Sequence, residues 1–290
     1  MTETALFIQY LLSGLYITGK YALPAIGLTL IFGVMGIADF AQGALYMLGA
    51  LFTFYIATRF QVNYFLALLI ATLLLVLIGI LNNSIIYKRL RGFEINTLIA
   101  ALGILLVIEN IVVAIFGGKY LTVPSPFGET KFEPLPRVII TAQELLIVFA
   151  SFSLIFLVWV FLNKTKTGKA LRAMSQDRDA ATLMGINIDR ISSVTFGIAA
   201  GLAGIDGALV APTQVILPQM GAMVILKAFV ITVVGGMGSI WGAVGGAFII
   251  GYTEIFTVAY LSPAYSSFIA FAILIVVLLV KPEGIWGDRT

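Results

Sequence analysis

The stretch AQELLIVFASFSLIFLVWVFL, residues 142–162, holds 21 residues with one charged side chain, Glu144, near its start. A helix needs about 20 consecutive apolar residues to cross the hydrocarbon core of a bilayer. Similar runs recur along the chain, and they do not alternate apolar with polar residues as the strands of a membrane barrel do. Because only helices and closed barrels satisfy the backbone in lipid, the sequence predicts an all-α polytopic membrane protein.

The composition agrees with this class of protein. Of the 290 residues 60% are hydrophobic and 11% are charged, and the mean hydropathy is +1.07. A soluble domain has about 25% charged residues. The chain contains no cysteine, which excludes disulfides and thiolate metal sites, and no histidine, the commonest metal ligand and general base. We therefore expect no metal site and no catalytic residue.

Apolar runs separated by polar segments predict eight to nine membrane-spanning helices in one domain of residues 1–290. Residues 5–18 either begin the first span or form a separate helix on the membrane surface. The expected spans cover residues 5–33, 38–58, 64–87, 95–116, 142–162, 191–212, two within 223–258, and 264–280.

The basic residues predict the orientation of these spans, because loops rich in Lys and Arg stay in the cytoplasm. Segments 88–91, 164–190 and 281–289 carry 11 of the 17 Lys and Arg residues, whereas the loops on the other side carry four. We therefore expect these segments and the C-terminus in the cytoplasm. Nine crossings then place the N-terminus outside.

Two glycine-rich stretches repeat at a shift of 202 residues, together with the spans that surround them. A glycine costs about 1 kcal/mol relative to alanine inside a helix, so this pattern predicts either close helix packing or broken helices beside a translocation path. We assign Gly43, Gly235, Gly236 and Gly238 to such a path, and the small residues of 199–211 to packing. The repeat aligns Gly33, Met35, Gly36, Gly43 and Gly49 with Gly235, Met237, Gly238, Gly245 and Gly251.

Several ionisable residues interrupt the apolar runs, each at a cost of about 2.5–3.5 kcal/mol near the middle of a membrane. They should therefore face a cavity or a partner charge. Lys227 is a candidate partner for Glu254 or Asp206. Asp39 either caps the helix that follows it or, together with Gln42, contacts a substrate. These residues are Asp39, Glu109, Asp206, Lys227 and Glu254.

The polar segment 163–190 differs from the rest of the chain, with six cations and three carboxylates in 28 residues. Its part TGKALRAMSQDRDAATLMGINIDR resembles the cytoplasmic loop of branched-chain amino-acid ABC permeases of the LivH type. TLIFGVMGIADFAQGALYMLGA, AFVITVVGGMGSIWGAVGGAFIIG and KPEGIWG resemble other segments of that family, in the same order. The likeness runs from about residue 5 to the end. The residues that carry it in the loop are Gly168, Leu171, Arg172, Ala173, Ala180, Ala181, Gly185 and Ile186.

The resemblance implies a permease subunit of an importer for branched-chain or other apolar amino acids in the bacterial inner membrane. Two ATPase subunits would hydrolyse ATP, a second homologous permease would complete the pore, and an external binding protein would deliver the substrate. No cofactor is expected in this chain, and TGK at 167–169 lacks the remainder of a nucleotide-binding loop. The segment 163–190 would be a coupling loop that docks on an ATPase through Gly168, Leu171, Arg172, Ala173, Ala181 and Gly185. We expect Leu171, Met174, Ala181 and Met184 to form its exposed apolar patch.

One departure from the family leaves the substrate open. Many relatives read Asn-Phe-Ala-His-Gly where this chain has Asp39-Phe40-Ala41-Gln42-Gly43. Permeases of similar sequence are assigned to urea, short amides or other amino acids, which are therefore alternatives. A transporter driven by an ion gradient, with Asp39 and Glu109 as ion or proton ligands, is a second alternative.

Overall fold

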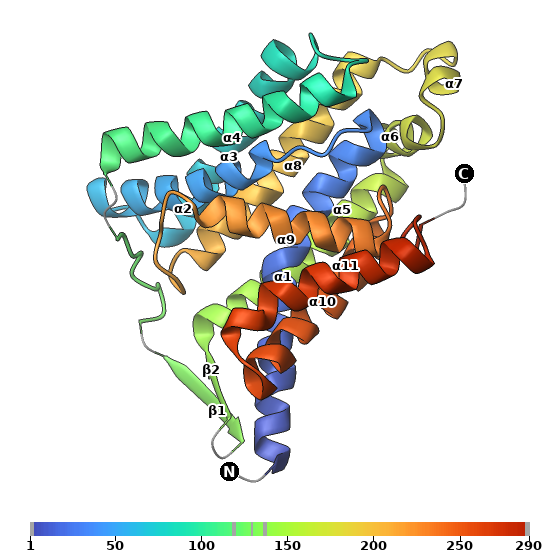
Figure 1. Ribbon diagram of the computed structural model, residues 1–290. Coiled ribbons are helices and arrows are strands. Elements are labelled where there is room, and N and C mark those ends of the chain that lie inside the picture. The colour runs from blue at the N-terminus through green and yellow to red at the C-terminus, as the bar shows by residue number, and fades with distance from the viewer. Residues whose placement is uncertain (1–2, 118–119, 129, 136–137, 288–290) are drawn as a thin grey trace.

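Long helices make up most of the computed structural model, which describes residues 3–117, 120–128, 130–135 and 138–287 (Figure 1). The helices are α1 (Glu3–Met35), α2 (Ala41–Arg59), α3 (Tyr64–Asn82) with a π-helical turn (Asn83–Tyr87), α4 (Glu94–Phe116), α5 (Ala142–Lys164), α6 (Lys166–Gln176), α7 (Arg178–Leu183), α8 (Ile188–Val210), α9 (Met220–Gly235), α10 (Ile240–Tyr260), a 3-10 turn (Pro263–Tyr265) and α11 (Ser266–Val280). Two short strands, β1 (Lys131–Leu135) and β2 (Val138–Thr141), form one hairpin.

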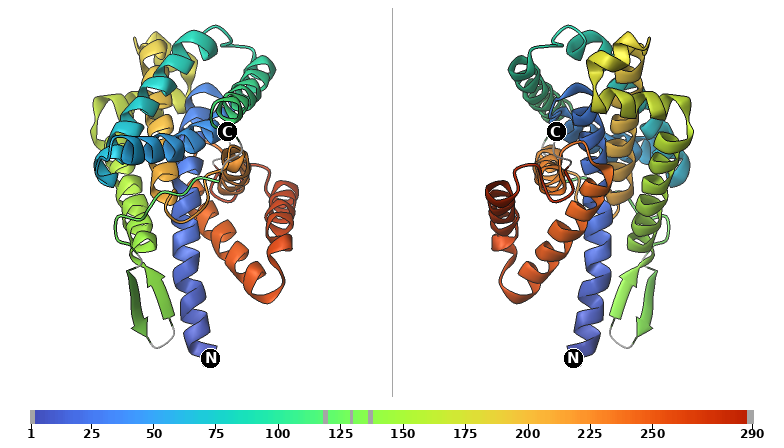
Figure 2. Two further views of the ribbon diagram at one scale, coloured as in Figure 1. Left: turned by 90° about the vertical axis from the view of Figure 1, so that its left-hand side faces the viewer. Right: turned by 90° about the vertical axis from the view of Figure 1, so that its right-hand side faces the viewer.

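The predicted number of spans is confirmed. Within the described ranges, eight helices are long and apolar enough to cross a membrane, and α9, with 16 residues, is a shorter apolar helix. Residues 5–18 belong to α1, a continuous helix of 33 residues, so they are not a separate surface helix. At 1.5 Å per residue α1 is roughly 50 Å long, and its N-terminal end projects beyond the other helices (Figure 2).

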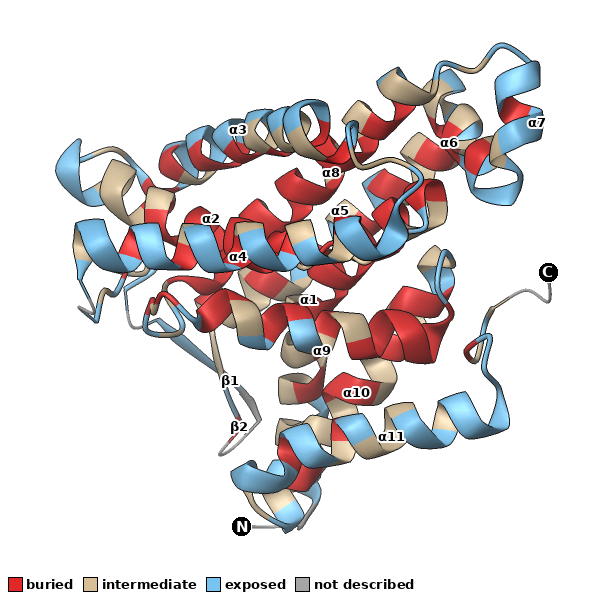
Figure 3. Ribbon diagram, turned by 45° about the horizontal axis from the view of Figure 1, so that its top comes forward, coloured by how far each residue is buried: buried red, intermediate tan, exposed pale blue. Residues whose placement is uncertain are grey.

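The core lies where α1, α2 and α8 pack together, and burial is concentrated in these helices, α9 and α10 (Figure 3). Helix α8 packs along α2 and α3. Its glycines permit this, because a Cβ on Gly201 would lie 3.0 Å from Val76 of α3 and one on Gly207 would collide with the backbone of Tyr46 on α2. The packing role predicted for 199–211 is confirmed. In contrast, α4 and α11 expose most of their apolar side chains, which suits a lipid environment.

The backbone supports the internal repeat. Helices α1 and α9 each run into a glycine turn, and the aligned residues Gly36 and Gly238 both have positive φ, +69° and +90°. Such angles are easily adopted only by glycine. The shift of 202 residues also places α3, which begins at Tyr64, over α11, which begins at Ser266. The helices break where the glycine pattern predicts.

Two of the basic segments, 88–91 and 164–190, lie at one end of the molecule. There α6 and α7 lie at the top of Figure 1, while the N-terminus and the β hairpin lie at the bottom. Lys88 and Arg91 each form a 2.7 Å salt bridge with Asp189 at the start of α8. At the opposite end, the hairpin was not expected from the sequence of the 117–137 loop. It is fixed to α1 by Gln9, whose side chain accepts a hydrogen bond of 2.9 Å from Ile139 N.

Candidate substrate path and coupling helices

The glycines assigned to the substrate path lie at close backbone contacts. A Cβ on Gly43 of α2 would lie 2.6 Å from the carbonyl oxygen of Gly221 and 2.8 Å from Ile225 Cγ2, so Gly43 marks the crossing of α2 with α9. Gly235 packs against the backbone of Gly242 in the same way, across the turn that joins α9 to α10. These contacts give both glycines a packing role, and their part in a substrate path stays a prediction.

The C-terminal segment, residues 281–287, packs against Gly236 at the end of α9. A Cβ on Gly236 would lie 2.5 Å from Gly287 N. The segment also donates backbone hydrogen bonds from Ile285 N to the Val234 carbonyl (2.9 Å) and from Trp286 N to the Gly235 carbonyl (3.0 Å). These bonds satisfy carbonyls that the end of a helix leaves free. The KPEGIWG segment therefore closes the α9–α10 turn.

Asp39 is buried between α1 and α2 and is held by three donors. Its Oδ1 accepts hydrogen bonds from Ala41 N (3.0 Å) and from the Tyr87 hydroxyl, and its Oδ2 accepts one from Gln42 Nε2 (3.3 Å). The bond to Ala41 N satisfies a free N–H at the start of α2, but the N-cap residue is Phe40, which has no side-chain cap bond, so Asp39 is not the N-cap that we considered. Asp39 and Gln42 therefore bind each other in this conformation.

A second polar cluster joins α1, α9 and α10 and includes an ion pair. Lys227 on α9 lies 2.7 Å from both carboxylate oxygens of Glu254 on α10. Tyr21 on α1 links the two, because its hydroxyl accepts a bond from Lys227 (3.0 Å) and donates one to Glu254 (3.3 Å). Of the two partners proposed for Lys227, the structure selects Glu254.

Lys20 belongs to the same cluster and was not among the predicted site residues. Its Nζ donates a 2.9 Å hydrogen bond to Gln214 Oε1, and Gln214 Nε2 in turn donates one to the Tyr46 hydroxyl (3.3 Å). Asp206 is fully buried, and neither of its oxygens has a hydrogen-bond partner in the described ranges. A lysine inside an apolar run is the signal that could have singled out Lys20. Its contact with Gln214, 194 residues away, has no counterpart in the sequence pattern.

An open cavity of about 220 Å³ lies beside this cluster. Lys20, Tyr21, Gln214 and Lys227 form its polar wall. Its remaining wall is apolar and comes from α9 and the segment that precedes it, namely Val215, Leu217, Met220, Met223 and Val224. The cavity therefore combines cationic groups with an aliphatic surface.

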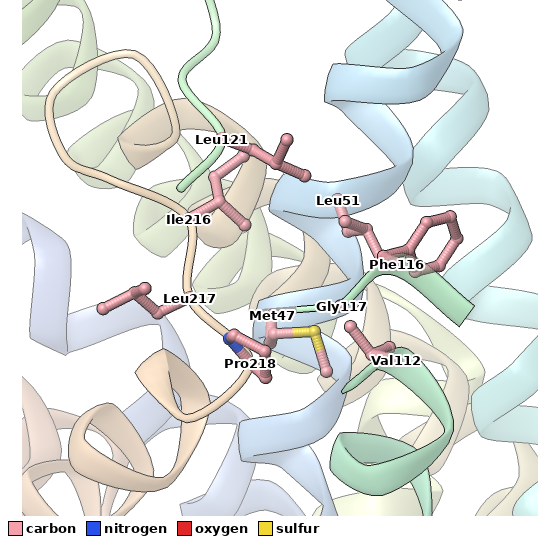
Figure 4. Close-up of a pocket in the computed structure, with 9 residues that line it drawn as sticks. All are labelled: Met47, Leu51, Val112, Phe116, Gly117, Leu121, Ile216, Leu217 and Pro218. Atoms are coloured by element: carbon pink, nitrogen blue, oxygen red, sulfur yellow. The ribbon is translucent and has the colours of Figure 1, made fainter. Parts of the chain in front are cut away.

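A narrow apolar crevice adjoins this cavity at Leu217, which lines both (Figure 4). It lies between α2, the end of α4, and the paired residues Leu121 and Ile216. Its free volume is about 10 Å³, no more than a single water needs. In this conformation the crevice is closed to a substrate.

Helix α6 is fixed to the membrane-spanning body. Gly168 packs against the backbone of Phe161 and Leu162 at the end of α5, where a Cβ would collide. Leu171 and Met174 are 3% and 2% exposed. Ala181 of α7 is also buried, at 4%. The prediction that Leu171, Met174 and Ala181 are exposed is therefore wrong, because these side chains attach the two helices to the rest of the chain.

The segment 163–190 contains two helices where one was expected. Asp177 adopts an extended conformation between them, and its side chain caps α7 by accepting a 2.9 Å bond from Ala180 N. Arg172 on α6 is exposed and donates to Asn163 Oδ1 (2.9 Å), and Ala173 beside it is partly buried. Gly185, with φ +84°, ends the α7 region. There the large exposed apolar side chains are Leu183 (89%) and Met184 (84%).

Long apolar helices, a charged cluster among them and polar helices at one end define a polytopic membrane transport protein. The chain matches the family described as branched-chain amino acid transport system, permease component, over residues 10–278. It therefore belongs to this family, and it is a transport subunit rather than an enzyme.

Relatives match over nearly the whole chain. The high-affinity branched-chain amino acid transport system permease protein LivH of Escherichia coli K12 is 33% identical, over 97% of this chain and 96% of its own. The corresponding protein BraD of Pseudomonas aeruginosa is 32% identical, over 99% and 98%. The fold is similar to that of PsaBC from Streptococcus pneumoniae in complex with Fab, with a TM-score of 0.51 and 13% identity over 94% of this chain and 92% of that one.

Proposed function

We propose that this chain is the membrane-spanning subunit of an ATP-driven importer of branched-chain or other apolar amino acids in the bacterial inner membrane. Two separate ATPase subunits hydrolyse ATP, a second homologous permease completes the pore, and an external binding protein delivers the substrate. The N-terminal end of α1 faces outward, and α6, α7 and the C-terminal segment face the cytoplasm. The observation that carries this proposal is the 33% identity to a branched-chain amino-acid permease along 97% of the chain.

The structure of α6 and α7 supports an arrangement in which separate ATPase subunits act on this chain. Helix α6 is anchored by its buried side chains, so a push on the neighbouring α7 passes to α5 and the other membrane helices. Leu183 and Met184 form an exposed apolar tip on α7, and such a tip suits a hydrophobic groove on another protein. We propose that this tip, together with Gly185, docks on the ATPase.

The alternative of an ion-gradient transporter has less support. Its proposed ligand Asp39 already accepts hydrogen bonds from Ala41, Gln42 and Tyr87. Glu109, the other proposed ligand, lies on α4 and has an unpartnered oxygen in the described part of the chain. The two alternatives differ in one measurable property, because a gradient-driven transporter takes up solute without ATPase subunits.

The docking proposal predicts that Leu183→Glu lowers ATP-dependent uptake of L-leucine by about tenfold or more, since a buried unpaired charge is costly at an apolar interface. Uptake would be measured in proteoliposomes that contain the purified complex and its binding protein. Gln176→Glu, which adds the same charge at an exposed position of α6, serves as the control and should transport like the unmodified complex. Normal uptake with Leu183→Glu would show that α7 is not the docking element.

A further inference from the structure

The charges around the cavity beside α9 are unevenly paired. Lys227 has a full ion pair with Glu254. Lys20 has no carboxylate oxygen within 4.0 Å among the described residues, and its only hydrogen bond there is to the neutral amide of Gln214. A lysine ammonium has three donors, so Lys20 retains donors that can bind another group.

The side chains of Lys20 and Lys227 both approach the aromatic ring of Tyr21. The ammonium groups of Lys20 and Lys227 are 5.7 Å and 5.1 Å from the centre of the Tyr21 ring. Two cations this close repel each other where water is scarce, and one of them has its counter-ion at hydrogen-bond distance. Asp206 shares no hydrogen bond with Lys20, and neither of its oxygens has a hydrogen-bond partner in the described ranges. The cluster therefore has a position for one additional anionic group, beside Lys20.

The remainder of the cavity matches an aliphatic group. Leu217, Met220 and Val224 line it together with the polar residues, and Met223, which also lines it, is 69% exposed. Beyond Leu217 lies the closed apolar crevice. A molecule with a carboxylate at one end and a branched aliphatic group at the other would satisfy both walls.

We propose that Lys20, positioned by Gln214, binds the carboxylate of an apolar amino acid as it passes through this cavity. The site then selects for a carboxylate, which urea and neutral short amides lack. The Lys227–Glu254 pair links α9 to α10 at the wall of the same cavity. This inference rests on the proposed transport function and adds the residue that recognises the substrate.

The test measures uptake of radiolabelled L-leucine by the complete complex in proteoliposomes, with leucine-loaded binding protein and ATP. Lys20→Gln should lower the uptake rate about tenfold or more, as expected for the loss of a charge-assisted hydrogen bond. Lys20→Arg keeps the charge and should stay within a few-fold of the unmodified complex. Arg59→Gln, which removes an exposed cation from the C-terminal end of α2, should leave uptake unchanged.

Copurification with the ATPase subunits shows whether each variant assembles. If Lys20→Gln fails to assemble, Gln214→Leu decides the question, because it removes only the group that positions Lys20 and should also lower uptake. Normal uptake by an assembled Lys20→Gln complex, or by Gln214→Leu in the second case, would overturn the assignment of Lys20 and leave the transport function intact. If the unmodified complex took up no leucine, the proposed function itself would fail, and this inference with it.

Discussion

At the scale of single residues, glycine acts in this protein mainly through the absence of a side chain. Gly49 on α2 lies directly against the backbone of Gly204 on α8, and Gly207 lies against Tyr46. Because lipid supplies no hydrophobic force between helices, close backbone contacts of this kind hold the bundle together. By contrast, Gly103 on α4 has open space where a Cβ would lie.

This difference predicts opposite effects of one substitution. Gly49→Ala should lower the free energy of unfolding by about 1–3 kcal/mol, since the added methyl group forces α2 and α8 apart. Gly103→Ala should leave it unchanged or raise it by up to about 1 kcal/mol, since alanine favours the helix. Thermal unfolding of the purified variants in detergent measures both changes. Equal midpoints for the two variants would contradict the packing role of Gly49.

At the scale of elements, the C-terminal segment acts as part of the α9–α10 turn. Gly284 has φ +84°, and a Cβ there would collide with Gly236. Gly92, in the loop before α4, has a similar φ of +91° but open space around it. A substitution at Gly92 therefore tests only the cost of a side chain in a left-handed backbone conformation. The same substitution at Gly284 adds the cost of a collision between two segments.

Gly284→Ala should detach the C-terminal segment, whereas Gly92→Ala should cost only about 1 kcal/mol from the backbone conformation. The measurement is limited proteolysis with an endoproteinase that cleaves after glutamate. Cleavage after Glu283 should be several-fold faster in Gly284→Ala than in the unmodified protein, and unchanged in Gly92→Ala. Equal protection of Glu283 in all three proteins would show that the segment does not depend on this contact.

The sequence predicted contacts that are local or periodic and missed those that depend on tertiary packing. Helix breaks followed from the glycine repeat, and Lys227 was assigned either Glu254 or Asp206 as its partner, of which the structure selects Glu254. Lys20 could not be matched to Gln214, because a polar residue in an irregular segment gives no periodic signal. For the same reason, the inward direction of Leu171 was not apparent, since an amphipathic helix does not show which protein covers its apolar face.

At the scale of the whole molecule, the distribution of basic residues predicts an orientation in the membrane. The basic segments 88–91 and 164–190 lie at the end that bears α6 and α7, and the hairpin and the N-terminal end of α1 lie at the other (Figure 1). The positive-inside rule places the first end in the cytoplasm. Under the proposed function, the external binding protein would approach the hairpin end and the ATPase subunits would approach the other end.

This orientation predicts which engineered thiols react from outside the cell. The chain has no cysteine, so Glu133→Cys on β1 and Gln176→Cys on α6, both at exposed positions, each provide a single reactive group. A membrane-impermeant maleimide added to intact spheroplasts should label Glu133→Cys and leave Gln176→Cys unlabelled until the membrane is permeabilised, because the bilayer separates the two ends. The unmodified chain serves as the control for background. Labelling of Gln176→Cys in sealed spheroplasts would show that α6 lies outside the cell and so contradict the predicted orientation. The α7 tip would then be unable to reach a cytoplasmic ATPase.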